Sequence, residues 1–501
     1  MSERRRDRAP DRSMQTAAAV LVFVTGCAVG PDPSRPAIAV PDTFVRAGAA
    51  EGSLAYEDWL SALGDPVLSE LVARGVAGNL ELAQADARVQ TARANARLSK
   101  AALLPSGTGR SSFQRQRISE ATAGLGALAG AGGGSGTPGI ENPADVYDAA
   151  FDASWELDFF GANRRALGAA RSDYQAALAD FTAARLRIGA DIARAYAEYR
   201  QAETLLALNA SALSAQRELL RLTEVKARLG DVTQLDVDQT RARLAALEAE
   251  RPGFEINRIV ALNQLAVLTG SAPGSVDALL ATPSLARIPS GLAMDDPAAL
   301  LRRRPDILAA EYRAAAATNR VGVEIAEYFP KIQIAGSIGT QAATSGDLLT
   351  GAAQTFSYGP SLSWRVLDFA RIESAIAAAR GREAEALAAY KLTVLTALED
   401  VETQAARFSG LSEERQKRRE SVAIQARVLE TISAQYRAGS VDYLAVLDAE
   451  RTLRAEEQSA ARAEANLLIA YASLAKALGG IESQAGESDA LTLTGASIAE
   501  R

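Results

Sequence analysis

The sequence of 501 residues contains no histidine, and Cys27 is its only cysteine. The absence of histidine excludes Ser-His-Asp and Cys-His catalytic arrangements and every metal site that depends on imidazole. A single cysteine excludes intrachain disulfides and metal sites built from several cysteines. Carboxylate-only chemistry remains, but no paired acidic motif has independent support. We therefore predict a protein that is not an enzyme and has no metal and no dissociable cofactor.

The sequence also lacks a basic excess and long apolar runs. It has 54 Lys+Arg against 61 Asp+Glu, which gives a net charge of −7. A nucleic-acid partner is therefore not expected, because binding one requires a positive field. The absence of an 18-residue apolar run is compatible with membrane strands, in which only alternate residues are apolar.

The first 26 residues have the anatomy of a secretory signal, with a basic start followed by a short apolar run, 17–24. The basic residues are Arg4, Arg5, Arg6, Arg8 and Arg12. The apolar run is too short to span a bilayer. Met14 is an alternative start, although it would remove the arginines. Residues 1–26 are therefore predicted to be a signal peptide.

The signal ends in Val-Thr-Gly-Cys, which resembles a bacterial lipobox. The resemblance implies cleavage before Cys27 and lipid on its thiol and on the new amino group. The alternative is a small buried cysteine. Ala28 follows where an aspartate would signal retention, so the pattern resembles that of outer-membrane lipoproteins. Residues 27–60, which begin proline-rich, are expected to form a lipidated tether.

Two stretches, 161–229 and 370–438, have no proline and are rich in strong helix formers. Apolar residues recur within them at spacings of three and four. Each would form a helix about 100 Å long, which a globular domain cannot hold. We therefore predict coiled-coil-like packing of very long helices.

Each long stretch ends in a similar turn, "ARLGDVTQLDVDQTR" at 227–241 and "YRAGSVDYLAVLDAER" at 436–451. At an offset of 209 residues the two turns share five positions. These are Arg228/Arg437, Gly230/Gly439, Val232/Val441, Leu235/Leu444 and Val237/Val446. The two glycines suit a left-handed helix end, and Thr233 and Asp442 suit N-caps of returning helices. Each turn is thus predicted to be the tip of an antiparallel helical hairpin, with Pro252 interrupting the first return helix.

Elsewhere the apolar period changes to two, which indicates strands. We expect strands at about 106–118, 145–157, 331–341 and 355–367, the first of them weakly patterned and assigned mainly by symmetry. The alternating residues include Tyr147, Phe151, Trp155, Ile332, Ile334, Ile338, Phe356, Tyr358, Leu362 and Trp364. Glycine-rich loops join the members of each pair.

Further markers show that the second half repeats the first. "ALLP" at 102–105 matches "EYFP" at 327–330, and Leu-Asp-Phe follows the second strand of each half. The expected organisation is repeat 1 at 61–270, a linker at 271–300, repeat 2 at 301–479 and a tail at 480–501. "RRRPD", 302–306, is interpreted as structural, because Pro305 suits the first turn of a helix.

Four alternating strands cannot close on themselves, and open sheet edges are prohibitive in lipid. Three chains would supply twelve strands, an even number within the range of outer-membrane barrels. The same assembly would place the long helices side by side as a tube. The predicted fold is therefore mainly α with membrane β: a trimeric twelve-stranded β-barrel continuous with an α-helical barrel.

The chain resembles the TolC-like outer-membrane factor family, in particular its NodT/OprM-like lipoprotein branch that serves RND-type efflux pumps. The resemblance covers nearly the whole chain after the signal. It rests on "WLSALGDPVLSELV", "NLELAQADARVQTARA", "ASWELDFFGANRR", "RRRPDILAAE", "LSWRVLDFARI" and "YRAGSVDYLAVLDAERTL". It implies a homotrimeric passive duct in the outer membrane that extends into the periplasm. A periplasmic adaptor, an inner-membrane pump and outer-membrane lipid are the implied partners, and 271–300 and the tail would form an equatorial belt.

The resemblance also places functions at the hairpin tips, of which a trimer would present six. The implied adaptor-docking residues are Arg228, Gly230, Leu235, Arg437, Gly439 and Leu444. Alternatively, the glycines and leucines only cap and pack the turns.

A periplasmic gate is implied on the helix after the second tip, at Leu444, Asp448 and Arg451. Leu444 and Asp448 lie one helical turn apart, and Arg451 could pair with Asp448. Repeat 1 has Gln239 at the position of Asp448, so we expect the second hairpin to move on opening while the first stays in place. The alternative is an ordinary surface ion pair.

A different class of protein would also have a lipid anchor and long helices. A periplasmic coiled-coil scaffold or adaptor without a pore is the main alternative. Alternating aromatic strands favour the duct, because a scaffold does not need them. The exported compound is not encoded in any recognisable motif.

Overall fold

The computed structural model describes residues 28–45, 59–117, 143–282, 286–290 and 297–480. The chain divides into two compact units, each assembled from separate stretches. Unit 1 comprises 1–35, 91–175 and 312–387, and unit 2 comprises 36–90, 176–311 and 388–501. The two longest helices contribute residues to both units.

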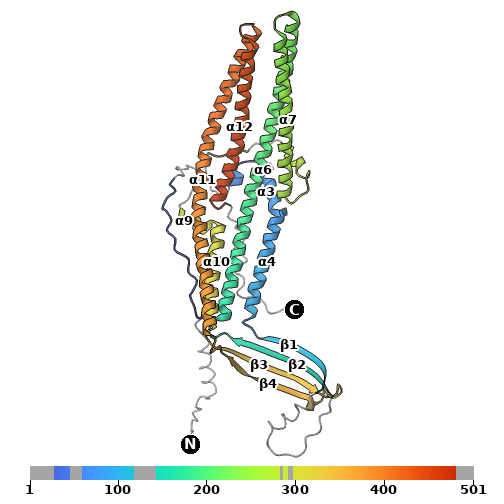
Figure 1. Cartoon of the computed structure of the whole chain (residues 1–501), viewed down its shortest axis with the longest axis vertical. Coiled ribbons are helices and arrows are strands. Elements are labelled where there is room, and N and C mark those ends of the chain that lie inside the picture. Colours follow the sequence, from blue (N-terminus) through green and yellow to red (C-terminus); the bar gives the residue numbers. More distant parts are fainter. Residues whose placement is uncertain (1–27, 46–58, 118–142, 283–285, 291–296, 481–501) are drawn as a thin grey trace, which may run out of the picture. The chain divides into compact units, whose positions relative to one another are not determined.

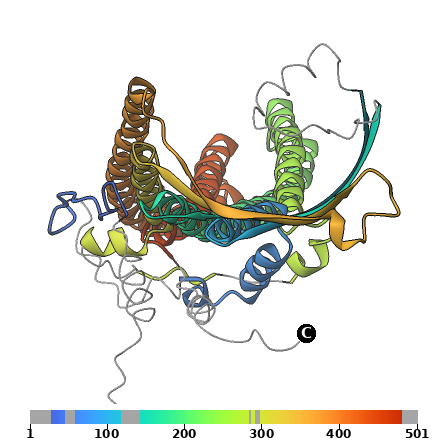
Figure 2. The same ribbon diagram turned by 90° about the horizontal axis from the view of Figure 1, so that it is seen from below.

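The described residues of unit 1 form a four-stranded antiparallel sheet in the order β1-β2-β3-β4. The strands are β1 (Ser106–Gln116), β2 (Ala144–Leu157), β3 (Lys331–Ala342) and β4 (Gln354–Ser363). A short 3-10 turn, η2 (Gly351–Ala353), precedes β4, and the sheet is curved (Figure 2). The last strand ends four residues before the expected 367, because the chain turns at 366–367 to enter the next helix.

The helices follow the predicted repeat pattern, with two long helices that each return through a shorter one (Figure 1). The long helices α6 (Ala162–Leu229) and α11 (Phe369–Arg437) have 68 and 69 residues. Their return helices α7 (Gln234–Leu268) and α12 (Tyr443–Ala477) have 35 residues each. The others are α2 (Trp59–Ala62), α3 (Pro66–Gly78), α4 (Leu80–Ala101), α8 (Asp277–Leu280), α9 (Pro297–Arg303) and α10 (Pro305–Ala326). The predicted fold class, two repeats each with a strand hairpin and a long helical hairpin, is confirmed.

The duplication extends to individual hydrogen bonds. The indole nitrogen of Trp155 donates to the carbonyl of Leu103, and that of Trp364 donates to the carbonyl of Tyr328, both at 3.0 Å. Each acceptor lies two residues before the proline of the matched "ALLP" and "EYFP" segments. The second strand of each pair is therefore fastened to the end of the helix that precedes the first.

The expected interruption of α7 at Pro252 is wrong. The helix continues through this proline. One missing amide donor costs only a few kcal/mol, and α7 is held on both sides of it. Before the proline, Leu247 is buried and its carbonyl accepts from Asn209 at 2.9 Å. After it, Leu262 and Leu265 are buried in the main core.

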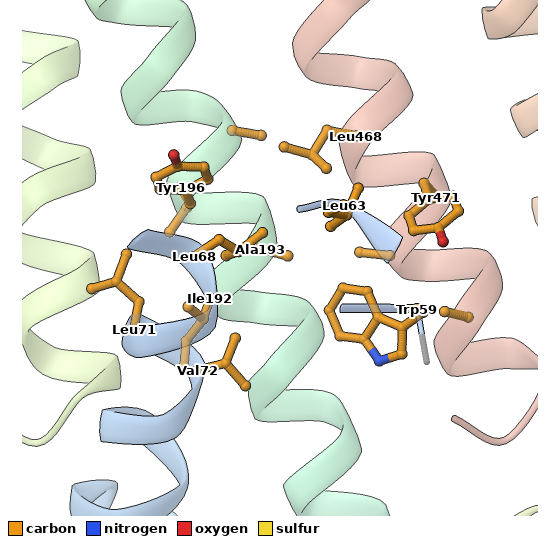
Figure 3. Packing of buried hydrophobic residues seen from close by; sticks show 14 of the residues in the cluster. Trp59, Leu63, Leu68, Leu71, Val72, Ile192, Ala193, Tyr196, Leu468 and Tyr471 are labelled. Carbon is orange, nitrogen blue, oxygen red and sulfur yellow. The ribbon is translucent and has the colours of Figure 1, made fainter. Parts of the chain in front are cut away.

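The main core lies in unit 2, where α2 and α3 pack against the long helices. Trp59, Leu63, Leu68, Ile192, Tyr196, Leu468 and Tyr471 belong to it (Figure 3). Asp65 caps α3 by accepting from the amides of Val67 and Leu68, and it also accepts from the Tyr196 hydroxyl at 2.6 Å. One buried carboxylate thus ties α3 to α6.

The "RRRPD" segment is structural, as expected. α10 begins at Pro305, and the buried Arg304 connects three helices of unit 2. Its guanidinium pairs with Asp306 at 2.7 Å and with Asp400 at 3.3 Å, and it donates to the carbonyl of Ala477 at 2.9 Å. These bonds join the start of α10 to α11 and to the end of α12.

Candidate functional site: sheet faces, hairpin tips and aperture residues

The strand register collects large apolar side chains on one face of the sheet. Phe113 lies opposite Tyr147, and Phe151 lies opposite Ile338, which in turn lies opposite Phe356. Because side chains alternate along a strand, the set of apolar residues on this face follows from the register. The apolar face carries Phe113, Tyr147, Phe151, Trp155, Leu157, Ile332, Ile334, Ile338, Phe356, Tyr358, Pro360 and Leu362. Most of the large side chains in this set are exposed within the chain, so this face suits contact with lipid.

The opposite, polar face carries ion pairs and hydroxyl groups. Arg110 on β1 pairs with Asp148 at 3.2 Å and with Asp152 at 3.5 Å, both on β2. Ser154, Ser337, Ser357 and Ser361 lie on the same face. One face thus suits hydrocarbon and the other suits water, as in the wall of an aqueous pore.

The strands β1 and β4 lie at the two edges of the sheet. Each pairs with another described strand on one side only, so each presents a row of backbone donors and acceptors on the other side. Such edges are not tolerated in lipid unless another strand pairs with them.

Among the described helices, none contains a stretch long and apolar enough to cross a membrane.

The first hairpin tip has the predicted turn chemistry. α6 ends at Leu229, and Gly230 follows with φ of 83°. Thr233 caps α7 in a capping box with Asp236. Of the expected docking residues here, Arg228, Gly230 and Leu235 are all exposed.

The second tip is built in the same way. α11 ends at Arg437, and Gly439 has φ of 76°. Asp442 caps α12 by accepting from the amide of Ala445 at 3.1 Å. Leu444 is 61% exposed although it is apolar. The left-handed glycines and both N-caps, predicted from sequence, are confirmed, whereas the docking role of these residues stays a prediction.

The two tips contact each other through residues that sequence reasoning missed. Gln216 on α6 donates to the Tyr443 hydroxyl on α12 at 3.3 Å and to the carbonyl of Thr240 on α7 at 3.1 Å. The Lys226 ammonium lies 4.3 Å from the centre of the Tyr436 ring. Burial raises the pKa of the Tyr436 hydroxyl. The helices of both hairpins are therefore joined within 14 residues of the glycines at their tips, the distance along the chain from Gln216 to Gly230.

A signal for this contact does exist in the sequence. Asn209, Gln216 and Thr223 are spaced seven residues apart on α6, and all three are buried. A heptad position that is polar three times in succession indicates a buried seam with specific hydrogen-bonding partners.

The expected gate residues lie one turn apart on α12, but they do not interact as expected. Asp448 and Arg451 are both exposed, and they form no ion pair with each other in the described chain. Arg454 is the arginine that makes contacts here, pairing with Glu457 at 2.8 Å and donating to the carbonyl of Leu208 at 3.3 Å. Burial raises the pKa of the neighbouring Glu450, while the charges of Arg454 and Arg243 act in the opposite direction.

The predicted lipidation site, Cys27, lies outside the described residues. The next residue, Ala28, is the first that the structure describes.

An amphipathic sheet with unpaired edges, combined with paired helical hairpins, defines a membrane-embedded conduit component. The family model of outer membrane efflux proteins matches residues 72–271 and 297–480. The chain therefore belongs to the outer membrane efflux protein family.

Individual relatives agree with this assignment. The chain is 28% identical to nodulation protein T of Rhizobium leguminosarum bv. trifolii, a match that covers 91% of the chain and 95% of that protein. It is 29% identical to outer membrane protein OprJ of Pseudomonas aeruginosa, over 92% and 95% of the two chains. The solved structure of the outer-membrane channel OprN is similar with a TM-score of 0.80 and 31% identity, covering 91% of this chain and 99% of that one.

The protein is an outer-membrane efflux channel of the kind that serves tripartite efflux pumps. It lies in the bacterial outer membrane and extends into the periplasm, and its family is one of channels rather than enzymes. The amphipathic sheet and this membership together exclude the alternative of a scaffold without a pore.

Proposed function

We propose that three copies of the chain assemble into one exit duct, with a closed twelve-stranded barrel in the outer membrane. The observation that carries the proposal is the four-stranded sheet with one exposed apolar face and two unpaired edges. Three such sheets joined edge to edge would leave no free edge and would place every apolar face toward lipid. The long helices would then form the periplasmic wall of the duct.

The internal repeat supports a second interface among the helices. α7 and α12 match at an offset of 209 along their whole length. On α12, Leu468 is buried and Ile469 packs against the main core. Their counterparts on α7, Ile259 and Val260, are 50% and 57% exposed. We expect a neighbouring chain to cover Ile259 and Val260 on α7, just as other helices of the same chain cover the equivalent residues on α12.

A second pair of equivalent positions indicates which helix of the neighbouring chain covers α7. On α6, Leu186 is buried, and a Cβ placed on Gly480 would lie 2.5 Å from its Cδ1. Its counterpart on α11, Leu395, is 58% exposed. The counterpart of Gly480 is Ser271, just after α7. We therefore expect α11 of one protomer to pack against α7 of the next.

This assembly is tested by disulfide trapping. Leu395→Cys combined with Ser271→Cys should link neighbouring chains and give covalent dimers and trimers on denaturing gels. The matched control, Leu186→Cys with Gly480→Cys, should link positions within one chain and give only monomers. Monomers from both pairs would contradict the proposed seam. The parent, whose only cysteine is Cys27, reports any background.

We further propose that the tips dock a periplasmic adaptor, which couples the duct to an inner-membrane pump. The six residues Arg228, Gly230, Leu235, Arg437, Gly439 and Leu444 would form the docking surface. Leu235 and Leu444 support this, because they are exposed apolar residues at equivalent positions of both tips. Leu444, Asp448 and Arg451 would line the periplasmic aperture.

Cys27 is proposed to carry the lipid anchor. The signal-like segment before it and the outer-membrane location support this proposal. Mass spectrometry of the N-terminal peptide should show acyl chains, and an unmodified Cys27 thiol would contradict it.

A further inference from the structure

The first described residues, 28–32, lie against the junction between β2 and α6 in unit 1. The amide of Val29 donates to the carbonyl of Phe160 at 3.1 Å. Arg165, in the first turn of α6, donates from Nε to the carbonyl of Val29 at 3.1 Å and from Nη2 to the carbonyl of Gly30 at 3.0 Å. Three hydrogen bonds therefore fix the backbone of two consecutive residues.

Small residues bring this segment close to the helices. A Cβ on Gly161 would lie 2.6 Å from the Cβ of Ala28, and a Cβ on Gly30 would lie 2.6 Å from the Cα of Gly322 on α10. Contacts at these distances do not occur, so glycine is required on both sides. Gly161 and Gly30 also have φ of 81° and 91°, a region in which other residues are strained.

The burial of Arg165 indicates what these contacts are for. Its side chain is 7% exposed, while that of its ion-pair partner Asp32 is 91% exposed. An ion pair with a carboxylate in water contributes little. A buried guanidinium needs acceptors for its N–H groups, and the carbonyls of Val29 and Gly30 supply them. The Arg165 guanidinium therefore holds the segment that directly follows Cys27.

We propose that Phe160, Gly161, Arg165 and Gly322 form an N-terminal seat, which positions the lipid anchor. The proposal rests on the proposed lipidation of Cys27. Consecutive Cα atoms are 3.8 Å apart, so an acylated Cys27 would emerge beside Gly161, where the sheet meets α6. The first residues of the expected tether would then be held in place, and the acyl chains would enter lipid at the end of the sheet from which the chain continues into α6. Arg165 is a positioning residue for the anchor.

The stacked rings of Phe160 and Phe329, with centroids 4.5 Å apart, support this placement. Phe160 lies between β2 and α6, and Phe329 lies between α10 and β3, so the two rings join these two junctions beside the seat. Aromatic side chains favour the boundary between hydrocarbon and water in outer-membrane proteins. The seat would therefore hold the attachment point at the depth where acyl chains begin.

The seat is tested on the full-length protein in outer membranes, with a nitroxide label on Asp32→Cys. The label should be largely immobile in this background. Arg165→Ala should make the mobile component of the spectrum dominant, and Arg165→Lys, which keeps the charge but not the planar fork, should give an intermediate spectrum. Arg171→Ala, which removes an exposed arginine from the same helix, should change nothing.

A second variant separates the seat from the folding of α6. Gly30→Val would place a side chain against Gly322 and expel the segment, while α6 and α10 keep their own residues. It should also mobilise the label, with trimer yield and heat stability unchanged. A label that is mobile in the labelled background, or that stays immobile in both Arg165→Ala and Gly30→Val, would overturn the proposal. Lipidation is measured separately by mass spectrometry of the N-terminal peptide. An immobile label on a chain without acyl groups would contradict lipidation but not the binding of residues 28–32 to the seat.

Discussion

The two repeats differ in charge at one position that follows the turn at each tip. Gln239 and Asp448 occupy equivalent positions after the two turns, so a three-fold assembly would bring three carboxylates, not six, toward one axis. Leu444 lies one turn before Asp448 and is exposed. The aperture should therefore depend on the second repeat far more than on the first.

Truncating both side chains tests this asymmetry. Leu444→Ala combined with Asp448→Ala should raise single-channel conductance in planar bilayers, because three apolar and three charged side chains would be removed from the proposed aperture. Gln239→Ala, the equivalent change in repeat 1, should leave conductance within the scatter of the parent. Unchanged conductance in the double variant would remove the gate assignment.

A second residue-level prediction concerns alkaline stability. Burial raises the pKa of Tyr471 from 10.0 to about 12, and its hydroxyl has no hydrogen-bond partner in the described part of the chain. The folded state favours the neutral hydroxyl more than the unfolded state does. The free energy of unfolding is therefore unaffected by this group below pH 10 and falls as the pH rises from 10 toward 12.

Tyr471→Phe should therefore stabilise the protein by up to about 1 kcal/mol, because an unsatisfied buried hydroxyl is removed. The loss of stability above pH 10 should also become shallower. Thermal transitions measured in detergent at pH 8 and pH 11 would show both effects. A variant less stable than its parent at pH 8 would mean that the hydroxyl has a partner.

At the scale of elements, the hairpins depend on turn chemistry at the tips and on a polar seam below them. Gln216 joins α6 to both α7 and α12. Its counterpart in the second repeat, Gln425, is only half-buried. The first hairpin is thus held by its own chain, whereas the same position on α11 would be covered by a neighbouring chain in the proposed trimer.

Gln216→Ala should loosen the tips. It leaves the carbonyl of Thr240 and the hydroxyl of Tyr443 without this donor, at a cost of about 1–3 kcal/mol. Hydrogen exchange of the peptides at both tips should become faster, with little change near Trp59. Gln425→Ala in the detergent-solubilised monomer is the matched control and should change exchange much less. Equal effects of the two variants would show that the seam is not specific.

These elements differ in how far sequence alone predicts them. Gly230, Gly439, Thr233 and Asp442 were identifiable because caps and left-handed turns depend on a few neighbouring residues. The strand β1 was weakly patterned for a structural reason. Its Gly107 pairs with Ala153, but the Phe151 ring lies over it and a Cβ there would lie 2.7 Å from that ring, so glycine replaces the large residue that alternation would require.

Contacts between distant elements were beyond sequence reasoning. The seven-residue spacing of buried polar residues that includes Gln216 indicates a seam, but it does not identify Tyr443, 227 residues away, as the partner. Pro252 was misjudged for the same reason, because the packing that keeps α7 helical comes from α6 and the main core. Arg165 was noticed only as part of a family motif, and its acceptors lie more than 130 residues away.

At the scale of the whole molecule, the proposed trimer predicts a hollow particle. Electron microscopy of protein extracted from outer membranes should show tubes on the order of 100 Å or more in length, with three-fold symmetry along the axis. The cysteine-trapped Leu395→Cys/Ser271→Cys protein should give the same images. Solid rods would contradict a closed duct even if the disulfides formed.

The equal lengths of α7 and α12 have a consequence for how such a chain can change. Both helices have 35 residues, and each is followed, two residues after its end, by an equivalent left-handed glycine, Gly270 or Gly479. Inserting one heptad into each arm of a single hairpin would lengthen it by about 10 Å. In the proposed trimer, three of the six tips would then project beyond the other three. A partner that binds all six tips would contact only three of them. Insertions and deletions should therefore be tolerated only when both halves of the gene acquire them together, so the two repeats are free to diverge in residue type but not in length.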